Sequence, residues 1–70
     1  MNAIIRTSYN PRDAEDIVRG EAGRGNAVFY TWDIYKESSH TIVGIETYDN
    51  SLESTERLQD LIYALEGYEL

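Results

Sequence analysis

The pattern of apolar and polar residues along the chain predicts three strands and two helices. Runs at 3–8, 27–36 and 41–48 are rich in β-branched residues or alternate between apolar and polar, which is typical of strands. The segments after the first and third runs carry apolar residues at spacings of three and four, which is typical of amphipathic helices. The order β-α-β-β-α predicts one α+β domain, residues 1–70. Its three-stranded antiparallel sheet would have both helices packed on one face.

The first helix is predicted to begin after Asn10, because Asn is a strong N-cap and Pro11 suits the first helical position. The helix should end at Gly20 or by Gly23. Its apolar stripe consists of Ala14, Ile17 and Val18. The glycine-rich segment 20–26 then closes a helix and precedes a strand, the reverse of a phosphate-binding loop, so we interpret it as a connection.

The last helix has the clearest amphipathic pattern of the chain. Asn50 followed by Glu53 has the character of a capping box, and Gly67 is a natural helix stop. The stripe predicted to face the core consists of Leu58, Leu61, Ile62 and Leu65.

Alternation assigns the strand residues to two faces of the sheet. In 27–36, the core face is predicted to hold Val28, Tyr30, Trp32 and Ile34. In 41–48, it is predicted to hold Val43 and Ile45. The solvent face would then carry Phe29, Tyr35, Ile42 and Tyr48, which is apolar for an uncovered surface. Either a tail or loop covers this face, or it is a contact surface, for example of a homodimer.

The length of 70 residues allows one thin hydrophobic core. The chain has no cysteine, which excludes disulfides and cysteine-based metal sites and fits a reducing compartment. No apolar run is long enough for a signal peptide or a membrane span. We therefore expect a cytoplasmic protein.

The net charge of −7 is unevenly distributed. Residues 1–35 hold four arginines against five acids, a balance of −1, whereas residues 36–70 hold two bases against eight acids, a balance of −6. An acidic protein is repelled by nucleic acids and anionic membranes, so neither is an expected direct partner. An acidic surface also serves solubility alone.

The sequence offers little for catalysis. Its single histidine, His40, falls in a predicted turn beside Ser38 and Ser39, without the context of a nucleophile elbow. No spacing typical of a calcium loop is present. We predict no catalytic residue, no metal and no cofactor.

A row of acids is the strongest candidate for a binding site. Glu53, Glu56 and Asp60 fall opposite the leucine stripe at spacings of three and four. A rise of about 1.5 Å per residue places them about 4.5–6 Å apart along the helix, near the roughly 6–7 Å between phosphates of a nucleic-acid strand. The candidate partner-binding residues are Glu46, Asp49, Glu53, Glu56, Asp60 and Tyr63. The alternative is a solvated helix face, in which Arg57 could pair with Glu53.

In length, charge and this acid row, the chain resembles the small acidic proteins that phages and mobile elements use against bacterial defences. These include anti-CRISPR and anti-restriction proteins that mimic DNA. The resemblance covers the C-terminal half and involves no sequence motif; strong mimics are often acidic throughout, unlike residues 1–35. It implies an inhibitor that binds the basic nucleic-acid site of a nuclease or CRISPR-type effector. One alternative is a non-enzymatic adaptor or regulatory subunit, monomeric or homodimeric, that uses the aromatic sheet face. Another is a small enzyme that depends on His40 or Asp33.

Overall fold

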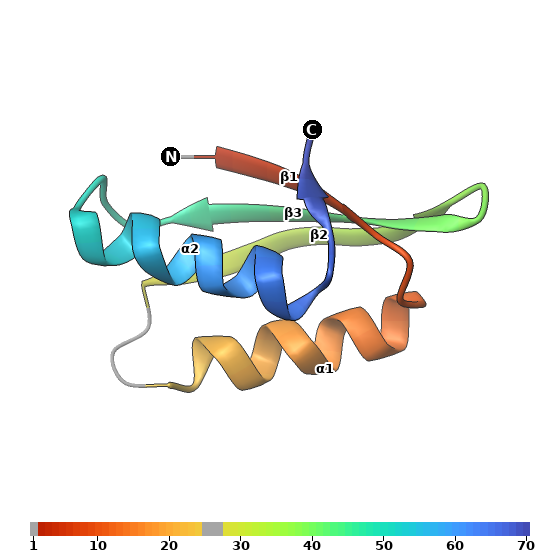
Figure 1. Cartoon of the computed structure of the whole chain (residues 1–70), viewed down its shortest axis with the longest axis horizontal. Coiled ribbons are helices and arrows are strands. Elements are labelled where there is room, and N and C mark those ends of the chain that lie inside the picture. The colour runs from red at the N-terminus through yellow and green to blue at the C-terminus, as the bar shows by residue number, and fades with distance from the viewer. Residues whose placement is uncertain (1, 25–27) are drawn as a thin grey trace.

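The computed structural model describes residues 2–24 and 28–70, which form an antiparallel sheet with two helices beneath it (Figure 1). Residues 25–27, assigned above to the end of the glycine-rich loop and the start of a strand, lie outside the described residues. In chain order the elements are β1 (Asn2–Thr7), α1 (Pro11–Ala22), β2 (Phe29–Glu37), β3 (His40–Thr47), α2 (Leu52–Ala64) and β4 (Tyr68–Glu69).

The sheet has four strands in the order β2-β3-β1-β4, with every neighbouring pair antiparallel. Strands β1 and β2 are therefore parallel to each other, separated by β3 and connected through α1. This split β-α-β arrangement, completed by α2 and β4, is the connectivity of ferredoxin-like folds. The α+β class and the placement of both helices on one face are confirmed, and the predicted number of three strands is wrong (Figure 1).

The additional strand is the segment that the sequence presents as a tail. Helix α2 ends at Ala64, Leu65 is its C-cap, and Glu66 follows in a left-handed conformation (φ 49). The Gly67 amide donates to the carbonyl oxygen of Ile62 at 3.2 Å. Gly67 then passes so close to β1 that a Cβ there would collide with the carbonyl oxygen of Arg6. This close approach brings Tyr68 alongside Arg6 in register. The helix terminus thus directs the chain onto the free edge of β1.

The helix ends follow capping chemistry, with one correction. Asn10 accepts a hydrogen bond from the Asp13 amide at 2.8 Å, and α1 ends at a Gly23 cap, as predicted. The N-cap of α2 is Ser51 and not Asn50, because the Ser51 hydroxyl accepts from the Ser54 amide at 3.2 Å. The predicted capping box of Asn50 and Glu53 is therefore wrong.

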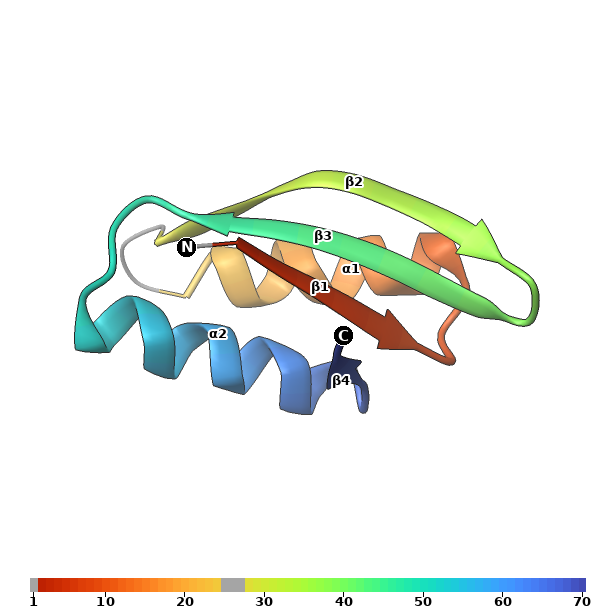
Figure 2. The ribbon, with the colours of Figure 1, turned by 90° about the horizontal axis from the view of Figure 1, so that it is seen from above.

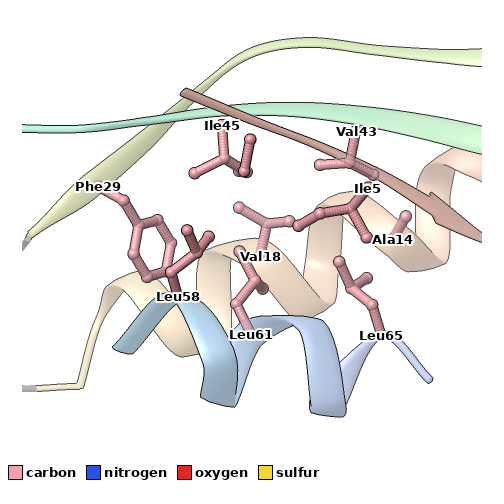
Figure 3. Close-up of a cluster of buried hydrophobic side chains, with 10 residues drawn as sticks. Ile5, Ala14, Val18, Phe29, Val43, Ile45, Leu58, Leu61 and Leu65 are labelled. Carbon is pink, nitrogen blue, oxygen red and sulfur yellow. The ribbon is translucent and has the colours of Figure 1, made fainter. Parts of the chain in front are cut away.

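The core lies between the sheet and the helices, and both predicted helix stripes contribute to it (Figure 3). Ile17 and Ile62, at the margins of those stripes, are half-buried. The buried apolar members are Ala3, Ile5, Ala14, Val18, Phe29, Val43, Ile45, Leu58, Leu61 and Leu65.

The faces of β2 differ from the predicted alternation because the strand contains a β-bulge. The register with β3 shifts between Thr31 and Asp33, which leaves Trp32 as the extra residue. Before the bulge, Phe29 faces the core, whereas Tyr30 lies on the opposite face, the reverse of the prediction. After the bulge the predicted phase holds, with Ile34 turned to the helix side. The bulge thus buries Phe29 and places Tyr30 and Trp32 on the outside.

Candidate protein-binding surface

The face of the sheet that the helices leave open carries most of the large exposed apolar side chains. Figure 2 views the molecule from this side, with the strands in front of α1. Alternation from the core residues Val43 and Ile45 assigns the outward positions, and the strand register extends the assignment to all four strands. We call this surface the aromatic sheet face: Ile4, Tyr30, Trp32, Tyr35, Tyr48 and Tyr68, which are 40% to 65% exposed.

At the centre of the aromatic sheet face, neighbouring side chains cover two residues of β3, Ile42 and Gly44. Ile42 lies on this side, opposite Arg6 and Tyr35 in register, yet it is only 4% exposed. Its neighbour Gly44 is covered by the Trp32 indole so closely that a Cβ on Gly44 would stand 2.5 Å from Cε2 of that ring. A glycine within a strand permits this approach. The Trp32 indole therefore covers Gly44, while the residue remains 52% exposed.

Two tyrosines and a glutamate occupy neighbouring outward positions near the start of β2. Glu46 is the register partner of Tyr30, and Tyr48 follows two residues later on the same side. The rings of Tyr30 and Tyr48 are in contact, with centroids 5.2 Å apart and planes tilted by 40°. The Tyr48 amide donates to the Val28 carbonyl oxygen at 3.0 Å, which holds its backbone against β2. Half-buried Glu46 thus lies beside an aromatic pair.

The charge of this face is predominantly negative. Asp33, Glu37 and Glu46 occupy outward positions on β2 and β3. Among the described residues, the cation at an outward position is Arg6, which donates from Nη1 to the Tyr68 hydroxyl at 3.0 Å. This hydrogen bond raises the pKa of Arg6. Among the described outward positions, acids thus outnumber cations.

The structure separates the predicted acid row into three parts. On α2, Glu53, Glu56 and Asp60 are exposed, as is Tyr63, so the helical part of the row lies together on one solvated surface. Glu46 lies on the other side of the sheet, facing away from α2. The row predicted from sequence proximity therefore does not continue through Glu46.

The Asp49 carboxylate binds the N-terminal cap of α2. Its carboxylate accepts from the Ser54 hydroxyl at 2.6 Å and from the Ser51 amide at 3.0 Å. These hydrogen bonds, that of Ser54 foremost, lower the pKa of Asp49 to about 2. Ser54 is fully buried in the first turn of α2, so the Asp49 oxygen that accepts from it points at the N-terminal end of this helix. The helix dipole favours an anion at that end.

Other polar groups connect elements of the fold. The Thr7 hydroxyl, buried in the core, donates to the Leu65 carbonyl oxygen at 2.6 Å. The Tyr9 hydroxyl donates to Glu66 Oε2 at 2.6 Å, which raises the pKa of Tyr9. Arg57 donates from Nη2 to the Glu21 carbonyl oxygen at 2.8 Å and joins the two helices.

The residues weighed for catalysis form no enclosed site. His40 is the first residue of β3 and is half-buried, in place of the exposed turn position expected for it. Its Nδ1 lies 3.3 Å from the Ser39 hydroxyl, which is exposed. A shallow hollow of about 520 Å³ is lined by Tyr63, Ala64, Glu66 and Gly67, away from His40 in the chain. In the described part of the chain, no three acids or histidines lie close enough to bind a metal ion together.

Sequence reasoning missed four members of the aromatic sheet face: Ile4, Tyr30, Trp32 and Tyr68. Gly44 was the available signal, because a glycine inside an otherwise β-branched strand marks a site of close approach. Nothing comparable marks Tyr68, whose strand has only two residues.

No protein-family model, curated protein or solved structure matches the chain. Across residues 2–24 and 28–70, no helix is both long and apolar enough to cross a membrane.

Proposed function

We propose that the protein is a non-enzymatic protein-binding module that docks onto a basic surface of its partner through the aromatic sheet face. The observation that carries this proposal is the exposure of five aromatic side chains on the one side of the sheet that the helices leave open. At roughly 200 Å² per aromatic side chain, their exposed fractions amount to about 500 Å². A patch of this size is at the upper end for a monomer, where such patches are often functional.

The area is also suitable for a specific complex. A standard interface buries about 800 Å² on each partner, so the aromatic residues alone would supply more than half of one side. Tyrosine and tryptophan are the residue types enriched at interfaces, since they combine large rigid contact area with a hydrogen-bonding group.

Charge supports a different protein as the partner over a second copy of this chain. Two copies packed face to face would bring Asp33, Glu37 and Glu46 of each near those of the other, and like charges in an interface are costly. A partner that presents arginine or lysine would instead meet complementary charge. The nucleic-acid site of a nuclease or CRISPR-type effector is one surface of that kind.

A second candidate function is supported by the exposed acids of α2. Glu53, Glu56 and Asp60 lie on one solvated surface with Tyr63, as an inhibitor that mimics nucleic-acid phosphates requires. In that mode, α2 and not the sheet would enter the basic site.

Matched variants distinguish these candidates in a capture experiment from bacterial lysate. Trp32→Ala/Tyr35→Ala removes aromatic area from the sheet face, whereas Leu52→Ala/Tyr63→Ala removes exposed apolar area from α2. We expect the first to lose a basic protein that the wild type and the second variant retain, with circular dichroism confirming that each is folded.

A third variant, Glu53→Lys/Glu56→Lys/Asp60→Lys, reverses the charge of α2. Loss of the captured protein in this variant, with retention by Trp32→Ala/Tyr35→Ala, would refute the sheet-face proposal in favour of the inhibitor that uses α2. Recovery of the chain itself as the retained species would instead indicate a homodimer.

A further inference from the structure

We infer that Tyr30, Glu46 and Tyr48 form an acceptor site for an arginine side chain of the partner protein. This inference rests on the proposed function and specifies the chemistry that the aromatic sheet face recognises. The structure places Glu46 opposite Tyr30 in the register of β2 and β3, and the Tyr30 ring against that of Tyr48. A carboxylate beside two aromatic rings matches the charge, the planarity and the donors of a guanidinium group.

The two rings provide an aromatic surface of defined orientation. Their centroids are 5.2 Å apart and their planes are tilted by 40°, so together they form a bent surface and not a parallel stack. Tyr48 is 65% exposed and Tyr30 is 43% exposed. A flat cation can therefore lie over the ring of Tyr48 while its edge remains near Tyr30.

The carboxylate of Glu46 is positioned to select the cation. Glu46 lies directly opposite Tyr30 in the register of β2 and β3, where side chains of a cross-strand pair are about 4.5–5.5 Å apart at Cβ. An ionised carboxylate accepts about four hydrogen bonds, so it can bind a guanidinium in addition to its contacts within the fold. A bidentate pair with arginine also fixes the plane of the guanidinium, which the point charge of lysine does not.

The surroundings of the site favour a protein-borne arginine over a free small cation. Trp32 and Tyr35 continue the apolar surface along β2, so the residues that flank the arginine in a folded partner would also gain contact area. Asp33 adds negative charge on the same face. The site is open to one side, as docking by a large partner requires.

The test is a titration of the intact protein with hexa-arginine and hexa-lysine peptides, followed by amide and aromatic-ring NMR shifts at about 0.15 M salt. We expect hexa-arginine to shift Tyr30, Glu46 and Tyr48, and to bind about two- to fivefold more tightly than hexa-lysine. Equal affinity for the two peptides, or shifts confined to α2, would overturn the inference.

Two pairs of variants complete the test. Glu46→Gln and Tyr48→Leu should each weaken hexa-arginine binding by about two- to fivefold. The matched pair Glu56→Gln and Tyr63→Leu, an acid and a tyrosine exposed on α2, should change it by less. Equal effects of both pairs would show non-specific attraction and refute the site. If Trp32→Ala/Tyr35→Ala still loses the captured partner in that case, the docking surface stands and only the arginine site fails.

Discussion

Replacing Phe29 and replacing Tyr30 should have very different consequences for stability, although the residues are adjacent aromatics in β2. Phe29 is 2% exposed and belongs to the core formed by the sheet and both helices (Figure 3). Tyr30 lies on the aromatic sheet face, where its ring contacts only one other aromatic ring, that of Tyr48, in the described part of the chain. The pair of variants Phe29→Ala and Tyr30→Ala therefore tests the bulge that determines which ring is buried.

The expected magnitudes differ by several-fold. Truncating a core phenylalanine to alanine costs about 3–5 kcal/mol, because apolar burial is lost and a cavity remains. A domain of this length has a total stability of about 3.5–10 kcal/mol, at roughly 0.05–0.15 kcal/mol per residue. Phe29→Ala thus removes about 30% of the total or more. Tyr30→Ala removes a partly exposed cross-strand contact, worth about 0.2–1 kcal/mol.

Urea unfolding, followed by far-UV circular dichroism and by the fluorescence of Trp32, measures both variants. With a slope of about 1 kcal/mol per molar urea for a small domain, a loss of about 3–5 kcal/mol means that Phe29→Ala should lower the unfolding midpoint by about 3–5 M or leave the protein unfolded in buffer. Tyr30→Ala should lower it by less than about 1 M. If Tyr30→Ala proves the more damaging, β2 has the regular alternation without a bulge, and the assignment of the aromatic sheet face is refuted.

Two further perturbations test the surface and the cap. Gly44→Ala should displace the Trp32 indole and red-shift its fluorescence, since the new Cβ would stand 2.5 Å from the ring. The control Gly20→Ala, with nothing within 4 Å of the new Cβ, should leave the spectrum unchanged. An unshifted spectrum for Gly44→Ala would contradict the packing of Trp32 on Gly44. The lowered pKa of Asp49, about 2 against an ordinary 3.8, means that its carboxylate stabilises the fold above about pH 4 and loses this effect as the pH falls toward 2. Asp49→Ala should therefore flatten the dependence of stability on pH over that range, whereas Asn50→Ala should retain it; the same slope in both variants would show that the cap does not depend on the Asp49 charge.

The parts of the fold that the sequence predicted well are those with a period repeated over several turns. The stripe of Leu58, Leu61 and Leu65 spans two turns of α2, so a single face is consistent with all three residues. The N-cap Asn10 and the proline after it specify the start of α1 by local chemistry. These signals depend on nearby residues alone and survive the formation of tertiary structure.

The failures lie where a distant strand determines the local conformation. The bulge in β2 changes the phase of alternation by one residue, and it is defined by the pairing with β3 and not by a residue within β2. Strand β4 has two residues, too few to show a period, and it exists because Gly67 allows close approach to Arg6. Alternation read along one strand cannot detect either feature.

The acid row shows the same division between local and distant determinants. Helical spacing correctly placed Glu53, Glu56 and Asp60 on the solvated side of α2. Glu46 belongs to a strand whose alternation turns it to the other side of the sheet, and Asp49 is directed at the Ser54 hydroxyl. Proximity in sequence across a strand end therefore did not produce proximity on one surface.

In the proposed complex, charge and apolar area would act at different stages of binding. The net charge of −7 extends attraction to a basic partner over about a Debye length, roughly 8 Å at physiological salt, and so raises the rate of encounter. Such attraction acts from both sides of the molecule, since the acids of α2 and those of the sheet face have the same sign. It cannot by itself select one orientation. The aromatic sheet face would add the larger desolvated contact area, with five exposed aromatic side chains against Leu52 and Tyr63 on α2, and such area lengthens the lifetime of a complex. Orientation would thus be determined by the surface with more aromatic rings, because charge alone attracts a partner without determining how it docks.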